Sequence, residues 1–100
     1  MSVITPEEVE KLLETEEITL IDVRESDEVA FEKIPGVLHI PLGELNLRLG
    51  ELNKETKYVI VCRSGNRSGI ATHLMNLQGY RALNMVGGML QWKGKVVSTV

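Results

Sequence analysis

The chain is poor in the residue types that build disulfides and metal sites. Its 100 residues include one cysteine, Cys62, and two histidines, His39 and His73. One cysteine excludes an intramolecular disulfide and any zinc site made of clustered cysteines, and two histidines are few for another metal site. We therefore expect no metal and no other cofactor.

The sequence also lacks an evident targeting or membrane-spanning segment. Its first residues have neither the basic stretch nor the long apolar stretch of a secretory signal, and no apolar run approaches the roughly 18 residues of a membrane span. A lone cysteine without an export signal is typical of a reducing compartment. We expect a cytoplasmic protein with no membrane partner, and a secreted form that has lost its leader is the alternative.

Positive charge is scarce except at one place. The net charge of −3 argues against a nucleic-acid partner. Arg63 and Arg67, however, lie in the short segment after Cys62, which indicates a small anionic ligand there. Acidic residues in the first third of the chain are typical of a solvated helix face and comprise Glu7, Glu8, Glu10, Glu14, Glu16 and Glu17.

Apolar periodicity predicts strands that alternate with helices. The predicted strands are residues 18–23, 37–40, 58–61 and 82–85, and the predicted helices are residues 6–14, 26–33, 41–52 and 67–78, with a last helical turn after Gly87 and Gly88. This alternation indicates one α/β domain over residues 1–100, with a mostly parallel sheet and helices on both faces. We expect a monomer.

Two of the predicted helices carry further local signals. Thr5 and Glu8 have the spacing of a capping box, with Ile4 and Val9 placed as a hydrophobic staple. In the helix over residues 67–78, we expect an apolar seam, which comprises Ile70, Leu74 and Leu77 and is widened by Ala71 and Met75.

The strongest functional signal is Cys62 at the end of a strand. An apolar run over residues 58–61 precedes it, and a short polar loop and a helix start follow it. In parallel sheets, ligands bind at the carboxyl ends of strands. Amide groups of the loop and of the first helical turn can converge on the sulfur and lower the pKa of the thiol from about 8.5. We therefore expect Cys62 to be a reactive thiolate; the alternative is an inert thiol in a structural turn.

The other residues of the loop supply candidate binding groups. Arg67 falls where the loop becomes a helix, so its guanidinium can reach an anion at the sulfur, and Arg63 is expected to point to solvent at the rim. We expect His39 and His73 to be structural or surface residues. The candidate substrate-binding residues are Arg63, Ser64, Gly65, Asn66, Arg67 and Ser68.

Four motifs in order make the chain resemble the rhodanese family, the single-domain sulfurtransferases. Residues 20–25 resemble that family's Asp-Val-Arg strand end, residues 34–42 its Ile-Pro-Gly segment, residues 62–68 its active-site loop, and residues 87–92 its closing Gly-Gly…Trp motif. The resemblance covers about residues 4–93, leaving a short C-terminal tail. The chain departs from the family at Glu32 and Lys33, where the family often has Gly-His.

The resemblance implies a rhodanese-like fold with a five-stranded parallel sheet and a thiosulfate sulfurtransferase activity. Cys62 would take sulfane sulfur from a small anionic donor, thiosulfate or a persulfide, and pass it to cyanide, a thiol or a protein acceptor. Asp22 and Arg24 match the strand-end motif, and we expect them to brace neighbouring loops as an ion pair. Trp92 is expected to be a packing residue.

Two other function classes compete with this interpretation. Cysteine phosphatases and arsenate reductases use a related loop with five residues between Cys and Arg, whereas four residues separate Cys62 from Arg67. A smaller loop suits sulfur better than a phosphoester. The domain could instead be a non-enzymatic sulfur carrier or interaction module, in which the two arginines contact an acidic partner.

Overall fold

A five-stranded parallel sheet forms the centre of the computed structural model, which describes residues 2–15 and 17–100. The strands lie in the order β1-β5-β4-β2-β3. They are β1 (Val3–Ile4), β2 (Thr19–Asp22), β3 (Leu38–His39), β4 (Lys57–Val61) and β5 (Arg81–Met85). The predicted α/β class with a parallel sheet is confirmed. Glu16, part of the predicted acidic face, lies outside the described residues.

The helices differ from prediction mainly in where they end. They are α1 (Pro6–Thr15), α2 (Ser26–Phe31), α3 (Leu45–Arg48), α4 (Asn66–Leu77) and α5 (Gly88–Gln91), with single 3₁₀ turns at η1 (Leu42–Glu44) and η2 (Leu49–Glu51). The predicted helix over residues 41–52 is therefore broken into three short pieces, and Gly43 and Gly50 explain why a continuous helix is unfavourable there. Within the part of the chain that is described, no helix is long and apolar enough to cross a membrane.

Strand β1 is an element that the sequence analysis missed. Val3 pairs with Asn84 and Ile4 with Met85 at the edge of the sheet. A two-residue strand is too short to show an alternating pattern, so only its partner reveals it. The predicted capping box beside it is confirmed, because the amide of Thr5 donates to Glu8 Oε1 at 3.0 Å and the amide of Glu8 donates to Thr5 Oγ1 at 3.2 Å.

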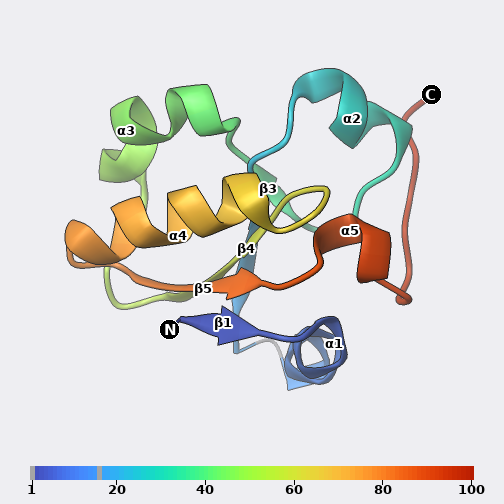
Figure 1. Cartoon of the computed structure of the whole chain (residues 1–100), viewed down its shortest axis with the longest axis horizontal. Coiled ribbons are helices and arrows are strands. Elements are labelled where there is room, and N and C mark those ends of the chain that lie inside the picture. The colour runs from blue at the N-terminus through green and yellow to red at the C-terminus, as the bar shows by residue number, and fades with distance from the viewer. Residues whose placement is uncertain (1, 16) are drawn as a thin grey trace.

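The side chains of β4 divide the core into two clusters. Tyr58, Ile60 and Cys62 face the cluster that α3 and α4 cover, whereas Val59 and Val61 face the cluster that α1 and α5 cover. Figure 1 shows α4 and α1 on opposite sides of the strands. Cys62 therefore points to the α4 side of the sheet, where its sulfur meets the first turn of that helix.

The predicted seam of α4 is right for Ala71 and Met75 and wrong for its ends. The buried residues of this helix are Ser68, Ala71, Thr72 and Met75. Ile70 and Leu77, which were assigned to the seam, are 56% and 69% exposed. Polar residues occupy the inner face because their hydroxyls find partners there; that of Thr72, for example, donates to the carbonyl of Ser68 at 2.7 Å.

The C-terminal segment folds back along α2 instead of extending from the domain. Lys33 and Val97 form an antiparallel bridge with two hydrogen bonds of 2.9 and 2.8 Å. The amide of Thr99 donates to the carbonyl of Ala30 at 2.9 Å. In Figure 1 the C-terminus accordingly lies beside α2. The bridge also explains why α2 ends at Phe31 and does not continue to residue 33, because Lys33 is held in an extended pairing.

Candidate active site

The carboxyl ends of β2 and β4 bring two of the sequence motifs together. The strands are adjacent and parallel, with Asp22 opposite Val61, and the amide of Val23 donates to the carbonyl of Val61 at 2.9 Å. Arg24, which follows β2, and Cys62, which follows β4, therefore emerge at the same edge of the sheet. This is the edge at which the sequence analysis placed the site.

The sulfur of Cys62 lies in a ring of hydrogen-bond donors. The Cys62 residue is 1% exposed. The amide of Gly65 donates to Cys62 Sγ at 3.0 Å, and Ser68 Oγ lies 3.2 Å from the same sulfur. Gly65 has a φ of 101°, a left-handed conformation that favours glycine and turns the loop so that its amide faces inward. The loop amide and the first turn of α4 thus converge on one atom.

This environment favours the thiolate form. Burial raises the pKa of Cys62, but the Ser68 hydroxyl and the amides of Ser68, Gly65 and Ser64 outweigh burial and hold the pKa below its ordinary value. The predicted lowering of the pKa is thus found without a histidine at the sulfur. The hydrogen-bond donors around the sulfur thus more than compensate for the effect of its burial on the pKa.

Asn84 links Ser68 to the loop and was missed by the sequence analysis. Ser68 Oγ donates to Asn84 Oδ1 at 2.5 Å, and Asn84 Nδ2 donates to the carbonyl of Gly65 at 3.1 Å. The Ser68 hydroxyl has one proton, so Asn84 Oδ1 competes with the sulfur of a Cys62 thiolate for it. A polar residue at the carboxyl end of an otherwise apolar strand is the sequence signal that could have identified Asn84.

The start of α5 supports the loop from the other side. The amide of Met89 donates to the carbonyl of Cys62 at 2.9 Å, and that of Leu90 donates to the carbonyl of Arg63 at 3.0 Å. Gly88 lies so close that a Cβ atom there would be 2.5 Å from the carbonyl oxygens of Cys62 and Arg63. The Gly-Gly motif therefore allows the close packing that fixes the backbone of the active-site loop.

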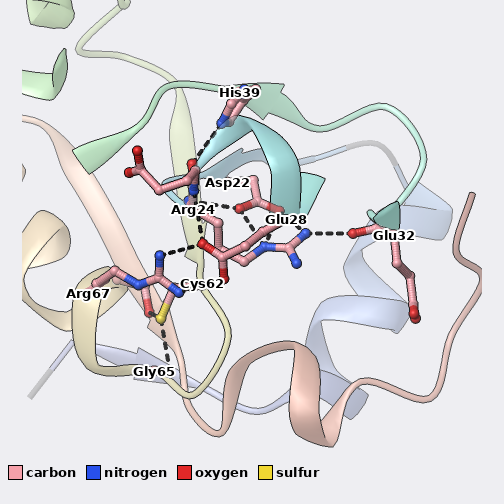
Figure 2. A network of polar contacts seen from close by, with 10 residues as sticks. Asp22, Arg24, Glu28, Glu32, His39, Cys62, Gly65 and Arg67 are labelled. Atoms are coloured by element: carbon pink, nitrogen blue, oxygen red, sulfur yellow. Dashed lines mark hydrogen bonds and ion pairs between the residues drawn. The ribbon is translucent and has the colours of Figure 1, made fainter. Parts of the chain in front are cut away.

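The guanidinium of Arg67, predicted from the sequence to reach an anion at the sulfur, contacts a carboxylate. Its Nη1 and Nη2 lie 2.7 and 2.9 Å from Glu28 Oε1 and Oε2, a bidentate ion pair. Figure 2 shows the Arg67 guanidinium between Cys62 and the Glu28 carboxylate. The bonds from Arg67 hold the pKa of Glu28 at about 2, so the carboxylate is ionised at neutral pH. Nothing in the local sequence indicates Glu28, which lies on a different helix.

Asp22 and Arg24 form the expected ion pair. Arg24 Nη2 lies 2.8 Å from Asp22 Oδ2, and the two residues are 5% and 0% exposed in the order Arg24, Asp22. Arg24 Nη2 also donates to the carbonyl of Glu32 at 2.7 Å, and His39 Nε2 donates to the carbonyl of Arg24 at 2.7 Å. Figure 2 shows this network above the cysteine loop. Through Arg24, the pair connects the end of β2 to the residue after α2. The bond from His39 holds the backbone of Arg24, which lies between these two elements.

The remaining candidate residues lie at or near the surface. Arg63 and Ser64 are exposed, as is Asn66, and the prediction that Arg63 points to solvent is confirmed. Arg63 lines a cleft of about 460 Å³ between α2 and α5. His73 is exposed on α4, and Trp92 packs against the cluster of α1 and donates through Nε1 to the carbonyl of Lys95 at 3.1 Å.

Comparison with known proteins places this geometry in a family. The model of the rhodanese-like domain matches residues 5–95. Two Bacillus subtilis proteins are similar: YtwF, provisionally named a sulfurtransferase, is 42% identical over 86% of this chain and 84% of its own length. YrkF, provisionally named a sulfur carrier protein, is 44% identical over 86% of this chain, which spans only 47% of YrkF.

A solved structure agrees with these relatives. The crystal structure of a rhodanese-like domain protein from Staphylococcus aureus has a TM-score of 0.88 and 35% identity to this chain, covering 95% of this chain and 94% of the other. The two Bacillus relatives are named for sulfur transfer or sulfur carriage. Since the family model spans most of the sequence and a relative of similar length exceeds 40% identity, the chain belongs to the rhodanese-like domain family.

Proposed function

We propose that this protein transfers sulfane sulfur through a persulfide on Cys62, from thiosulfate or a persulfide donor to a thiol or cyanide. The observation that carries the proposal is the ring of donors around the buried sulfur, with the Gly65 amide at 3.0 Å and the Ser68 hydroxyl at 3.2 Å. Such a ring stabilises negative charge on sulfur before and after the transfer. The sulfurtransferase and sulfur carrier names of the relatives support the same class.

The transfer has two balanced steps. In the first, the Cys62 thiolate attacks the outer sulfur of the donor, a sulfur–sulfur bond forms at Cys62, and the donor's own sulfur–sulfur bond breaks. Sulfite leaves from thiosulfate, and a thiolate leaves from an organic persulfide. In the second step the acceptor thiolate or cyanide attacks the outer sulfur of the Cys62 persulfide, and the thiolate of Cys62 is restored.

Each group of the site has a distinct role in this proposal. The amides of Ser64, Gly65 and Ser68 hold the sulfur charge, and the exposed Arg63 guides a donor to the rim. Arg67 lines the site with its charge shared with Glu28. Asn66 is the first residue of α4. The Asp22–Arg24 pair positions the neighbouring loop and does not take part in the chemistry.

Phosphatase or arsenate reductase chemistry suits this site less well. A phosphoester would need the guanidinium after the loop as its binding group, and Arg67 is held in a bidentate pair by Glu28. Hydrolysis of an aryl phosphate without any loading of sulfur onto Cys62 would support this alternative.

The decisive experiment is the intact mass of the protein after incubation with thiosulfate or with an organic persulfide. We expect one added sulfur atom on the wild type and none on Cys62→Ser. We also expect turnover with cyanide as acceptor, which the variant loses. Loading without turnover would favour the sulfur carrier alternative, and loading of the variant would contradict the mechanism.

We further propose that the chain acts as a monomeric single domain in the cytoplasm. The small size and the single free thiol support this setting. Light scattering of the purified chain tests the monomer, and fractionation of cells that express it tests the compartment.

A further inference from the structure

We propose that the site prefers a small organic persulfide to thiosulfate, because Glu28 neutralises the arginine beside the sulfur and the cleft beside the loop offers three apolar side chains to the donor's organic group. The inference rests on the sulfur transfer proposed above and specifies its donor. It reverses the role that the sequence suggested for Arg67, namely an anchor for a small anion.

The charges of the cleft beside the Cys62 loop oppose a small dianion. Arg67 is paired with Glu28 and Arg24 with Asp22, so neither guanidinium carries an uncompensated charge. The other charged groups that line the cleft beside the loop are the carboxylates of Asp27 and Glu32 and the guanidinium of Arg63. Two negative charges thus face one positive charge.

The same cleft offers apolar contacts to an organic group. Phe31 and Leu90 are 70% and 58% exposed, and Met89, which also lines the cleft, is held at the Cys62 loop by the bond from its amide to the Cys62 carbonyl. The cleft has a volume of about 460 Å³, within the usual range for a small-molecule site. Thiosulfate has no apolar part that would use these side chains.

The chemistry of a protonated persulfide suits this environment. The Cys62 thiolate attacks the outer sulfur of R–S–SH, the sulfur–sulfur bond of the donor breaks, and R–S⁻ leaves while Cys62 retains the outer sulfur with its proton. One negative charge enters the reaction and one leaves it. Thiosulfate would bring two more negative charges to a site that already holds the Cys62 thiolate.

The first test reads the charge at the sulfur without any sulfur transfer. Iodoacetamide and iodoacetate are similar in size and differ by one negative charge, and each alkylates Cys62 with loss of iodide. In the wild type, we expect the ratio of the iodoacetate rate to the iodoacetamide rate to lie below that of a free thiol in solution. In Glu28→Gln the ratio should rise about fivefold, because the guanidinium of Arg67 is then unopposed.

The substitution of Glu28 by glutamine is designed to preserve the fold. The amide oxygen of the introduced side chain can still accept the hydrogen bond that the amide of Glu25 donates to Glu28 Oε1 at 3.0 Å. Glu51→Gln is the matched control, since it removes a carboxylate from a distant pair with Arg48. An unchanged ratio in Glu28→Gln, or an equal rise in Glu51→Gln, would overturn the charge argument. If Glu28→Gln fails to fold, the wild-type ratio alone decides, and a value at or above that of the free thiol refutes the proposal.

The second test compares donors. The probes are thiosulfate, the persulfide of N-acetylcysteine and the persulfide of its methyl ester, which lacks the carboxylate charge. We expect the methyl ester to load Cys62 at the lowest concentration and thiosulfate at the highest. In Glu28→Gln the thiosulfate concentration that gives half-maximal loading should fall about fivefold. The corresponding concentration of the methyl ester persulfide should change less than about twofold.

Substitution of Phe31 tests whether the apolar side chains of the cleft bind the donor. We expect Phe31→Ser to raise the concentration of the ester persulfide needed for loading several-fold without affecting thiosulfate. Leu47→Ser is the control, since Leu47 is 89% exposed elsewhere. Wild-type loading by thiosulfate at concentrations as low as those of the ester would refute the inference and leave the proposed function intact. Loading by none of the donors would refute the proposed function, whereas the alkylation ratio would still report on Glu28.

Discussion

Replacing Ser68 by alanine tests whether its hydroxyl stabilises the Cys62 thiolate. Ser68 Oγ lies 3.2 Å from the sulfur and is the strongest of the groups that lower the pKa of Cys62. Ser68→Ala removes this donor but keeps the amides of residues 64, 65 and 68. We therefore expect the pKa of Cys62 to rise and the pH profile of its alkylation to move to higher pH.

The size of the shift follows from the hydrogen bonds of Ser68. Hydrogen bonds to charged groups contribute about 1.5–3 kcal/mol, and the Ser68 proton is shared with Asn84 Oδ1 at 2.5 Å, so the lower end applies. About 1.5 kcal/mol corresponds to about one pKa unit, or a roughly tenfold smaller thiolate fraction at pH values below the pKa. The Asn84 oxygen also loses its donor, which should lower the free energy of unfolding by about 1–3 kcal/mol.

The assay is the rate of iodoacetamide alkylation as a function of pH, with urea unfolding measured in parallel. Ser64→Ala is the matched control, because Ser64 contributes through its backbone amide and its side chain is exposed. Its profile should coincide with that of the wild type. A Ser68→Ala profile that does not move, or one that Ser64→Ala reproduces, would show that the hydroxyl donates only to Asn84 and that the amides alone hold the charge.

Two further pairs of variants test how the site is supported. Gly88→Ala should cost about 3 kcal/mol or more of unfolding free energy and disrupt sulfur loading, because its Cβ would lie 2.5 Å from the Arg63 carbonyl at a positive φ. Gly36→Ala, which has a positive φ but open space, should cost only about 1–2 kcal/mol; equal losses would contradict the packing argument. Arg24→Ala should cost about 3–5 kcal/mol, since it leaves the carboxylate of a buried ion pair uncompensated. Arg48→Ala, which removes a surface ion pair, should lower the free energy of unfolding by about 1 kcal/mol or less. If Arg24→Ala and Arg48→Ala lower the free energy of unfolding equally, the role assigned to burial is refuted.

Much of the fold was predictable because its signals are local. The capping box joins residues three apart, and the apolar run over residues 58–61 identifies a buried strand whatever surrounds it. The loop that holds Cys62 and Gly65 was predictable for the same reason, because a strand, a turn and a helix follow one another directly in the sequence there. The strand end that holds Asp22 was identified by its resemblance to the family's Asp-Val-Arg motif, and the structure pairs it with the strand that precedes Cys62.

Errors arose where distant parts of the chain decide the outcome. Strand β1 exists only because β5 offers it hydrogen bonds, and the inner face of α4 is polar because Ser68 meets Asn84. Neither partner is visible in the periodicity of the element itself.

By itself, the amino-acid sequence determined the alternation of strands and helices, the thiol at a strand end and the turn that surrounds it. Tertiary structure alone decided the electrostatics of the entrance, because the partner of Arg67 is Glu28, 39 positions away in the chain. A side chain's charge can be read from sequence, but whether it is free or neutralised depends on which other charge the fold brings within hydrogen-bond distance. Of the two donors that the sequence left open, thiosulfate and a persulfide, that one contact favours the persulfide in our proposal.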